Sequence, residues 1–418
     1  MVVTVVGLGF VGLTTALGFV QYGHKVYGVE INKERLETIK SGKLPFLEPE
    51  LDNALIRHLG AKFIPTDSWD EGIKDSDCVY FCVGTPYGEN GEADLTYLFS
   101  AIDSALRVAS DDKFRVFVTK STIPPSTSSQ RIIPFIESLG KKVGIDIGVA
   151  NNPEFLREGH CWDDFINADR IVLGVAQNDK KSELILRDLY ANCGCAVHVV
   201  SLHTGEFIKY LSNTVLATLI SYANEMSIAA DIIGDIDIAG AFRILHEDKR
   251  WQSGSIRSYF YPGCGYGGYC LPKDTNAFHA VLKQNGFNAP ILENVIKTND
   301  RIPEVATNRV LNALSNNKNA KIGILGLSFN VGSDDVRDTP SAKIIKNLMD
   351  QGYSNICAYD PVAINEFKKL YNFSIKYENN LNTIISNSDI LVITTAWQEF
   401  KNLKEVTNKQ IVDLRYML

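Results

Sequence analysis

One cysteine in a glycine-rich segment has the surroundings that a catalytic nucleophile needs. Residues 263–274 read G-C-G-Y-G-G-Y-C-L-P-K-D, so four glycines precede Cys270, and Lys273 and Asp274 follow it. Glycine lets the backbone approach a ligand closely or take a positive φ angle. A thiol held at such a bend, beside a lysine and near a carboxylate, gains access, a lowered pKa and a proton acceptor. The alternative is a glycine-rich turn that carries a buried structural cysteine.

Three glycines near the start of the chain have the spacing of a dinucleotide-binding turn. The apolar residues 2–6 are followed by G-L-G-F-V-G at 7–12, by a helical pattern, and by a second apolar run that ends in Glu30. These glycines permit a tight turn, the approach of a pyrophosphate to the helix N-terminus, and close packing of helix on strand. The carboxylate of Glu30 suits a ribose 2′-hydroxyl and repels a 2′-phosphate, so we expect NAD rather than NADP. The alternative is a glycine turn in a protein without a nucleotide.

Polar segments follow further strands of the same expected sheet. Apolar, β-rich runs lie at residues 78–83, 114–119 and 147–150. Because ligands of doubly wound sheets bind beyond the carboxyl ends of the strands, the polar residues at these ends are expected along one edge. They are Thr85, Thr122, Glu154 and Glu158. Each alone could be a strand-end cap, but their place beside a dinucleotide site favours a ligand-binding role.

A long helix is expected from residue 203 to about residue 233, a stretch without proline. Within it Glu206, Lys209 and Asn213 recur at spacings of three and four, which places them on one face. A solvated face with an ion pair would explain these residues in an average helix. The surrounding residues are apolar almost all round, which indicates a buried connecting helix in which a lysine needs a function. The apolar surface between residues 211 and 230 also predicts a two-fold homodimer.

The rest of the chain repeats the alternation of strand and helix. After Asp274 a helical pattern continues to about residue 299, and a second α/β unit with a degenerate glycine turn follows. We do not expect this second turn to bind NAD. The predicted fold is α/β, with two Rossmann-like doubly wound parallel-sheet domains joined by a long central helix and a small helical domain. The expected boundaries are 1–200 for the NAD-binding domain, 201–300 for the central domain with the cysteine loop, and 301–418 for the C-terminal domain.

Composition excludes several classes of protein. With 418 residues, 22% of them charged and 45% apolar, the chain has the make-up of a soluble enzyme of two or three domains. A formal net charge of -7 argues against general nucleic-acid binding, and no apolar run reaches the roughly 18 residues of a membrane helix. The chain starts without a signal-peptide pattern and its eight cysteines are scattered, so we expect a cytoplasmic protein. Cys193 and Cys195 lack a second metal-type pair, so no metal site is expected.

Seven motifs, in order over nearly the whole chain, resemble those of the UDP-glucose/GDP-mannose dehydrogenase family. They are G-L-G-F-V-G at 7–12, G-T-P at 84–86, K-S-T at 120–122, N-P-E-F-L-R-E-G at 152–159, E-F-I-K-Y-L-S-N at 206–213, G-Y-G-G-Y-C-L-P-K-D at 265–274 and G-L-S-F…D-D-V-R-D-T-P at 326–340. The family oxidises a sugar primary alcohol to a carboxylate, removing four electrons with two NAD+ and releasing no free aldehyde. The resemblance implies an NAD-dependent nucleotide-sugar 6-dehydrogenase, with UDP-glucose favoured and a UDP-N-acetylhexosamine or GDP-mannose as alternatives.

The resemblance also implies roles for individual residues. Cys270 matches the nucleophile, which adds to the aldehyde to give a thiohemiacetal and then a thioester. Lys209 matches the lysine that stabilises oxyanions, and Glu154 matches the carboxylate proposed as general base for thioester hydrolysis. The residues that match partners of the sugar or of the catalytic water are Asn213, Asp274 and Thr122.

The matched motifs also give expected ligand contacts, and the C-terminal domain is expected to bind the UDP part of the substrate. For NAD the contacts are Gly7, Gly9, Phe10, Val11, Gly12, Glu30, Arg35, Thr85, Thr122, Glu158, Lys273 and Arg337. For the nucleotide sugar they are Glu154, Phe155, Leu156, Lys209, Asn213, Arg250, Arg257, Tyr259, Gly267 and Phe329.

Two segments depart from the family pattern. Asn330 follows Phe329 where the family usually has a substrate-binding lysine. The family's Arg-Ile-Gly segment, whose arginine reaches the neighbouring subunit's site, is replaced by a longer one in which either Arg250 or Arg257 could take that role. Both changes affect substrate recognition, so the sugar stays open between the alternatives.

Two other classes of function fit parts of the sequence. A two-electron dehydrogenase, such as a hydroxyacid enzyme, shares the nucleotide fold and an active-site lysine but has no use for Cys270. A regulatory protein that binds a nucleotide sugar without catalysis would not need Cys270, Lys209 and Glu154 together. The complete set therefore favours the four-electron enzyme.

Overall fold

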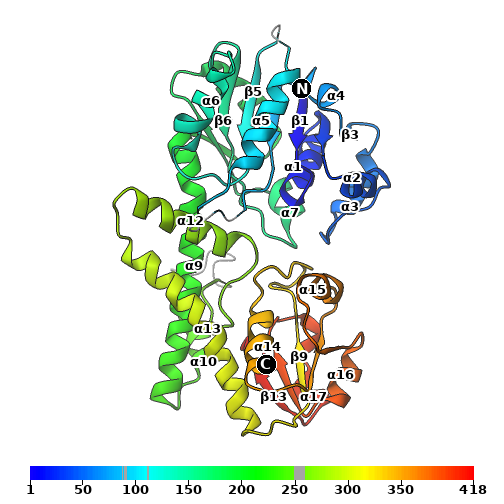
Figure 1. The fold of residues 1–418 in the computed structure, drawn as a ribbon, viewed down its shortest axis with the longest axis vertical. Coiled ribbons are helices and arrows are strands. Elements are labelled where there is room, and N and C mark those ends of the chain that lie inside the picture. Colours follow the sequence, from blue (N-terminus) through cyan, green and yellow to red (C-terminus); the bar gives the residue numbers. More distant parts are fainter. Residues whose placement is uncertain (87, 89–91, 111–112, 249–258) are drawn as a thin grey trace. The chain divides into compact units, whose positions relative to one another are not determined.

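The computed structural model describes residues 1–86, 88, 92–110, 113–248 and 259–418. The chain divides into two compact units, Met1–Leu211 and Ser212–Leu418. Figure 1 shows a sheet with flanking helices in each unit. The long helix α9 (Leu202–Ile233) runs from the first unit into the second, as the sequence pattern predicted. In the described part of the chain, no helix is long and apolar enough to cross a membrane.

The first unit is built on an eight-stranded sheet with the order β3-β2-β1-β4-β5-β6-β7-β8. Its strands are β1 (Val2–Val6), β2 (Lys25–Val29), β3 (Phe63–Thr66), β4 (Cys78–Phe81), β5 (Arg115–Thr119), β6 (Ile147–Asn151), β7 (Arg170–Val175) and β8 (Ala196–Ser201). The strands from β3 to β6 in this order are parallel, which is the arrangement of a dinucleotide-binding sheet. β7 pairs antiparallel with β6, a step that the sequence pattern did not predict.

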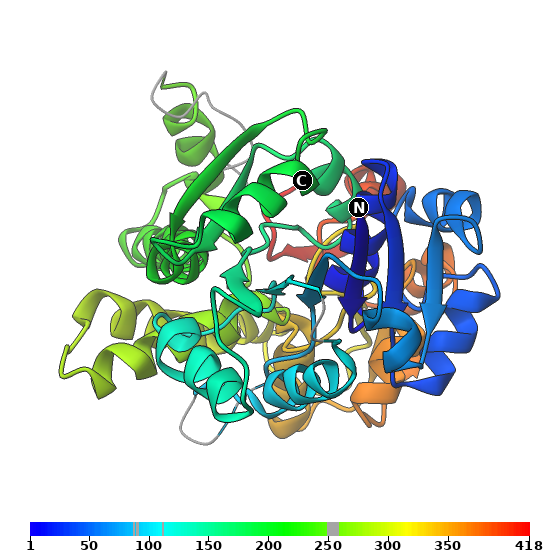
Figure 2. The ribbon, with the colours of Figure 1, turned by 90° about the horizontal axis from the view of Figure 1, so that it is seen from above.

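Helices cover both faces of this sheet (Figure 2). They are α1 (Phe10–Gln21), α2 (Lys33–Lys40), α3 (Leu51–His58), α4 (Trp69–Ile73), α5 (Thr96–Val108), the π-helix η2 (Ser128–Ile132), α6 (Ile133–Ser138), α7 (Cys161–Ile166) and α8 (Lys180–Leu189). Val3 and Val5 belong to one core cluster, whereas Val6 and Phe81 belong to another. Because successive strand residues face opposite sides, burial of both faces explains the continuous apolar runs.

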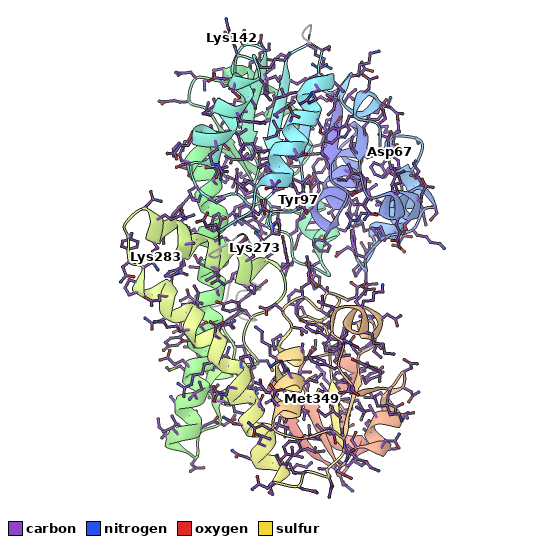
Figure 3. All side chains as sticks on the ribbon, in the orientation of Figure 1. Asp67, Tyr97, Lys142, Lys273, Lys283 and Met349 are labelled. Carbon is purple, nitrogen blue, oxygen red and sulfur yellow. The ribbon has the colours of Figure 1, made fainter. Side chains whose placement is uncertain are left out.

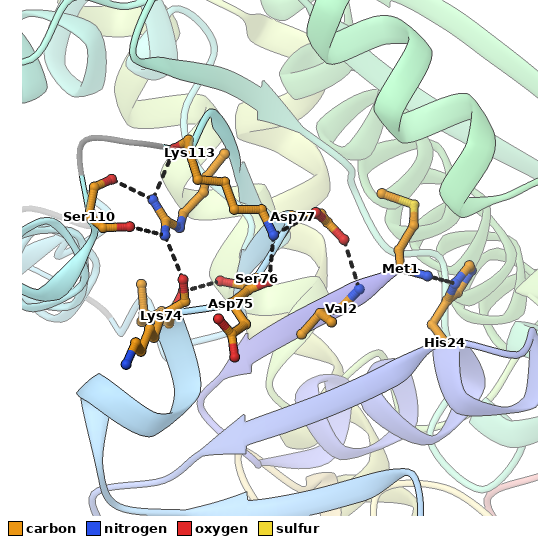
Figure 4. A network of polar contacts seen from close by, with 11 residues as sticks. Met1, Val2, His24, Lys74, Asp75, Ser76, Asp77, Ser110 and Lys113 are labelled. Carbon is orange, nitrogen blue, oxygen red and sulfur yellow. Dashed lines mark hydrogen bonds and ion pairs between the residues drawn. The ribbon is translucent and has the colours of Figure 1, made fainter.

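A polar network closes the amino-terminal edge of the same sheet (Figure 4). Asp77, just before β4, accepts a hydrogen bond from Val2 N at 2.8 Å. Its other oxygen pairs at 2.8 Å with Nζ of Lys113, which lies just before β5. The guanidinium of Arg115 donates to backbone carbonyls of the neighbouring loops. These bonds join the amino ends of β1, β4 and β5, whereas ligands of doubly wound sheets bind beyond the carboxyl ends of the strands.

The second unit contains a five-stranded parallel sheet with the order β11-β10-β9-β12-β13. Its strands are β9 (Ile322–Leu325), β10 (Ile356–Tyr359), β11 (Lys376–Tyr377), β12 (Ile390–Ile393) and β13 (Gln410–Asp413). Its helices are α10 (Ile238–Leu245), α12 (Cys270–Gln284), α13 (Pro290–Leu314), α14 (Pro340–Asp350), α15 (Ile364–Leu370), α16 (Leu381–Asn387), η4 (Gln398–Phe400) and α17 (Leu403–Val406). The predicted fold class is therefore confirmed, whereas the three domain boundaries stay a prediction.

One expected helix differs in the structure. The sequence pattern predicted a helix from Asp274 to about residue 299, but α12 begins at Cys270 and ends at Gln284. Gly286, with a φ of 77°, and Pro290, at the start of α13, separate the two helices. The earlier start matters because it places the Cys270 thiol at a helix N-terminus.

Candidate active site

The glycine turn after β1 leaves backbone donors open at the start of α1. Gly7 has a φ of 87°, and a side chain at Gly12 would overlap Gly7 O, so both positions require glycine. A side chain at Gly9 would meet nothing within 4 Å. α1 begins after Gly9 without a side-chain cap or an acidic residue in its first turn, at the expected contacts Phe10 and Val11. An uncapped helix N-terminus beside open space fits the pyrophosphate of NAD.

The carboxylate at the end of β2 is tied to this turn. Glu30 is buried, and its Oε2 accepts a hydrogen bond from Leu8 N at 2.9 Å while Oε1 accepts one from Asn32 N at 2.8 Å. Arg35, another expected NAD contact, lies with Nη1 3.2 Å from Oε2. A carboxylate has about four acceptor positions, so these contacts leave room for a ribose hydroxyl.

Two expected NAD contacts meet beyond β4 and β5. Thr85 Oγ1 donates to Thr122 O at 3.1 Å, and Ser121 Oγ donates to Val83 O at 2.6 Å in the same junction. Glu158, expected to contact NAD as well, is partly buried in the segment after β6. The structure thus brings Thr85 and Thr122 together at the carboxyl edge of the sheet.

A buried ion pair forms between the segment after β6 and α9. Lys209 Nζ donates to Glu154 Oε1 at 2.6 Å, and Leu156 N donates to Oε2 at 2.7 Å. Burial raises the pKa of Glu154, but the Lys209 ion pair, the Leu156 N–H and the charge of Lys120 bring it below its ordinary value. The ring centroid of Phe155 lies 5.8 Å from Lys209 Nζ. The geometry provides an ionised carboxylate beside an ammonium, which suits a base next to a site for negative charge.

Glu206 does not join this pair, although it shares the helix with Lys209. Its carboxylate accepts hydrogen bonds from Ser126 N and Ser128 N, the latter at 2.7 Å. Burial raises the pKa of Glu206 in spite of these bonds. Glu206 therefore anchors the segment after Thr122 to α9, which spacing on the helix alone could not reveal.

The Cys270 thiol stands at the first position of α12 and is partly exposed. Tyr269 precedes it as the N-cap residue without a side-chain hydrogen bond, and the first turn of α12 contains no acidic residue. The thiol therefore lies at the positive end of the α12 dipole, and Lys273 follows it three residues later in the same helix. The sequence-based expectation of a nucleophile therefore applies to a thiol that is partly exposed at the start of a helix and is not buried in the core.

Asp274, four residues after Cys270, contacts two other expected site residues, Asn213 and Lys273. Asp274 is fully buried and accepts a hydrogen bond from Asn213 Nδ2 at 2.6 Å. Asp274 also forms an ion pair with Lys273, which is buried. Figure 3 labels Lys273 and a second lysine of α12, Lys283. Burial lowers the pKa of Lys273, but the charge and hydrogen bond of Asp274, followed by Cys270, raise it above its ordinary value.

Tyr269 contacts expected site residues and was not singled out from the sequence. Arg337 Cζ lies 4.4 Å from its ring centroid and Lys273 Nζ lies 5.5 Å from it, so the ring contacts two expected NAD-binding cations. Arg337 also pairs with Asp335 at 2.6 Å. The only available signal was an aromatic residue directly before the cysteine.

The loop that carries the thiol is held by neighbours far away in the sequence. Gly268 N donates to Arg337 O at 3.0 Å, and a side chain at Gly268 would lie 2.9 Å from the ring of Phe329, an expected substrate contact. A side chain at Gly267 would lie 2.5 Å from a backbone oxygen, that of Asp338. Asn299 on α13 accepts from Tyr266 N at 2.8 Å and donates to Tyr266 O at 3.1 Å. Asn299 was not predicted, because its partner lies on another element.

The second glycine turn differs from the first in what its acid contacts. Asp360, which follows β10 as Glu30 follows β2, accepts from Leu327 N at 2.7 Å and from Ser328 N at 3.1 Å. Its carboxylate also accepts from Trp397 Nε1 at 3.1 Å and from two further backbone N–H groups. With so many protein donors, Asp360 has little capacity left for a ribose.

Tyr259 is partly buried in the second unit, and Arg250 and Arg257 lie outside the described residues. Over the ranges that the structure describes, no group of three or more His, Cys, Asp or Glu side chains could hold a metal ion.

Comparisons with known proteins give a family match over nearly the whole chain. Residues 1–194, 203–301 and 323–418 match the NAD-binding, central and UDP-binding domains of the UDP-glucose/GDP-mannose dehydrogenase family. A UDP-glucose 6-dehydrogenase of Rickettsia bellii is 36% identical, over 100% of this chain and 96% of its own.

Two solved structures are also similar over 100% of this chain. One is a UDP-glucose dehydrogenase from Pyrobaculum islandicum, with 32% identity, a TM-score of 0.92 and 94% of its own chain covered. The other is a UDP-D-ManNAc dehydrogenase from Pyrococcus horikoshii, with 27% identity, a TM-score of 0.86 and 96% covered. The chain belongs to the UDP-glucose/GDP-mannose dehydrogenase family and is an NAD-dependent nucleotide-sugar 6-dehydrogenase.

Proposed function

We propose that this enzyme oxidises UDP-glucose to UDP-glucuronate in two steps, through a thioester on Cys270. The observation that carries the proposal is the thiol at the uncapped start of α12, beside Lys273, since a two-electron dehydrogenase needs no nucleophile. The names of the relatives support UDP-glucose as the substrate. The balanced reaction converts one alcohol, two NAD+ and one water into one carboxylate, two NADH and three protons.

The residues that would hold NAD fit its parts. The open N-terminus of α1 at Gly9 takes the pyrophosphate, and Glu30 takes a ribose hydroxyl. Thr85, Thr122, Glu158, Lys273 and Arg337 are the remaining proposed contacts. When bound, NAD+ supplies the hydride acceptor for each oxidation.

The chain's own residues perform the covalent step. The Cys270 thiolate forms a bond to C6 of the aldehyde, whose oxygen takes the electron pair and then a proton to give a thiohemiacetal. Loss of a hydride and a proton from this species gives the thioester. Water then adds to the thioester, and the C–S bond breaks to return the thiolate.

Two buried clusters would stabilise charge and accept protons during these reaction steps. One contains Lys209 and Glu154, and the other contains Asp274 and Asn213. Lys209 stabilises the oxyanion that forms in each addition, and Glu154 accepts the proton of the attacking water. Asp274, which is fully buried and accepts a hydrogen bond from Asn213, and Thr122 are the proposed partners of that water. The proposed contacts of the nucleotide sugar include Phe155, Leu156, Tyr259, Gly267 and Phe329.

A UDP-N-acetylhexosamine is the second candidate substrate, because one departure from the family pattern leaves the identity of the sugar open. Asn330 stands after Phe329, where the family usually has a lysine, and its Oδ1 accepts from Val331 N at 2.9 Å. An amide in place of an ammonium changes the groups offered to the sugar. The similar structure of a UDP-D-ManNAc dehydrogenase supports the same alternative.

Counting NADH across a panel of nucleotide sugars tests the function. UDP-glucose should give the highest kcat/KM and two NADH per sugar, ahead of UDP-N-acetylmannosamine, UDP-N-acetylglucosamine and GDP-mannose. A higher kcat/KM for an N-acetylhexosamine would change the substrate, and one NADH per sugar would contradict the four-electron reaction.

A further inference from the structure

Lys120 is a buried ammonium with a neutral partner. It directly follows β5, and only 4% of it is exposed. Its Nζ donates to Asn152 Oδ1 at 2.9 Å, and Tyr190 Oη donates to the same oxygen at 2.5 Å. Asn152 is fixed in turn, because its Nδ2 donates to Val172 O at 2.8 Å. Within the described part of the chain, no carboxylate pairs with Lys120. A buried ammonium without a counter-ion destabilises the fold, so its presence calls for a function.

The charge of Lys120 acts on the buried pair of Glu154 and Lys209. Three titratable groups influence Lys120: Cys82 after β4, Glu154 after β6 and Lys209 on α9. Burial lowers the pKa of Lys120 to about 8, since the opposing effects of Cys82 and Glu154 are smaller. Lys120 in turn lowers the pKa of Glu154. The cluster therefore holds two ammonium groups and one carboxylate, and its excess positive charge is poorly screened in the protein interior.

In the proposed reaction Lys209 interacts with two negatively charged groups, the Glu154 carboxylate and the substrate oxyanion. Its ammonium lies 2.6 Å from Glu154 Oε1, and in the proposed reaction it has to face the substrate oxyanion during each addition. As Lys209 turns to the oxyanion, Glu154 loses its nearest counter-charge in a buried place. Burial then favours the protonated carboxyl, which cannot accept a proton from water.

We propose that Lys120 keeps Glu154 ionised while Lys209 stabilises the substrate oxyanion. Lys120 is thus a positioning residue that acts through the charge of Glu154 and does not touch the substrate. The inference rests on the proposed function for its kinetic consequence, but the interaction of Lys120 with Glu154 exists without substrate and can be tested by itself.

The kinetic test compares two Lys→Met variants at opposite ends of β5. In Lys120→Met, the acid limb of the kcat–pH profile should move upward by about one pH unit, because Glu154 loses a buried positive charge that lowers its pKa. Lys120→Gln, which keeps an N–H donor for Asn152 but no charge, should move the limb equally. Lys113→Met is the control, because Lys113 pairs with Asp77 at the amino edge of the sheet (Figure 4). An unmoved limb in Lys120→Met and Lys120→Gln would overturn the proposal.

A double-mutant cycle measures the interaction between Lys120 and Glu154 without any need for enzyme turnover. The effects of Lys120→Met and Glu154→Gln on urea unfolding at pH 7 should not add, and the non-additivity should increase in a Lys209→Met background. Additive effects in both backgrounds would overturn the inference. If the wild type oxidised no nucleotide sugar, the proposed function would fail, and the cycle would still report whether Lys120 acts on Glu154.

Discussion

At the scale of single residues, Cys270 separates the proposed reaction into its two oxidations. Cys270→Ser replaces the thiol by a weaker nucleophile whose ester is a poorer acyl donor than a thioester. The first hydride transfer does not use the thiol, so the variant should stall as a covalent ester or after one NADH per site. Mass spectrometry of the variant with substrate measures the adduct on the peptide that contains residue 270. Near wild-type turnover with two NADH per sugar would contradict the thioester route.

Glu30 should set the preference for NAD. Its buried carboxylate, held by Leu8 N and Asn32 N, repels a 2′-phosphate, so kcat/KM with NAD should exceed that with NADP by at least about tenfold, or roughly 1.4 kcal/mol. Glu30→Ala should narrow this ratio. Glu34→Ala, which removes an exposed acid from α2, should leave it unchanged. Equal kcat/KM values for the two cofactors in the wild type would remove the role of Glu30.

Lys120 should make stability depend on pH in the absence of substrate. Burial lowers its pKa to about 8, whereas a lysine in the unfolded chain has a pKa of about 10.4. Between these two pKa values the unfolded chain binds more protons at Lys120 than the folded chain does. The free energy of unfolding therefore rises with pH over this range. Lys120→Met should be more stable than the wild type at pH 7, by up to about 3 kcal/mol, and the difference should shrink towards pH 10.5. Urea unfolding at both pH values measures this; no difference at pH 7 would mean an ordinary pKa.

At the scale of elements, the loop before α12 depends on an amide of α13. Asn299→Ala removes both hydrogen bonds to Tyr266, so the Cys270 loop should shift and kcat should fall on the order of tenfold to a hundredfold. Asn294→Ala is the control on the same helix, because its Nδ2 donates to Pro290 O, one turn back on α13 itself. The rate of alkylation of Cys270 by iodoacetamide, followed by mass spectrometry, reports the shift without turnover. Unchanged alkylation and kcat would show that Asn299 does not position the loop.

The positions of strand ends could be predicted from the sequence, and contacts between distant segments could not. Thr85, Thr122 and Glu154 follow apolar runs, and in any parallel sheet such positions share one edge. The bonds of Lys120 to Asn152 and of Asn299 to Tyr266 depend instead on how separate elements pack. The antiparallel pairing of β7 with β6 was not predicted for a related reason, because an apolar run does not indicate the direction of its strand in the sheet.

At the scale of the whole molecule, α9 belongs to both compact units. It carries Lys209 near the end of the first unit and Asn213 near the start of the second, about one helical turn apart. Lys209 pairs with Glu154, and Asn213 bonds Asp274, so each unit anchors its own part of the helix. A substitution that unwinds α9 should therefore disturb both clusters, whereas one on its exposed face should spare them.

The exposed face of α9 predicts self-association of the chain. Phe207, Leu211 and Val215 recur every fourth residue and are 42%, 49% and 46% exposed, and an apolar stripe of this kind marks an interface. We propose a homodimer through this stripe. Leu211→Glu should shift the enzyme to a monomer, because it places a charge within the apolar contact. Ile145→Glu, at a side chain that is 68% exposed and outside α9, should remain dimeric. Light scattering at micromolar concentration measures the mass; a monomeric wild type would contradict the dimer, and a dimeric Leu211→Glu would place the interface elsewhere.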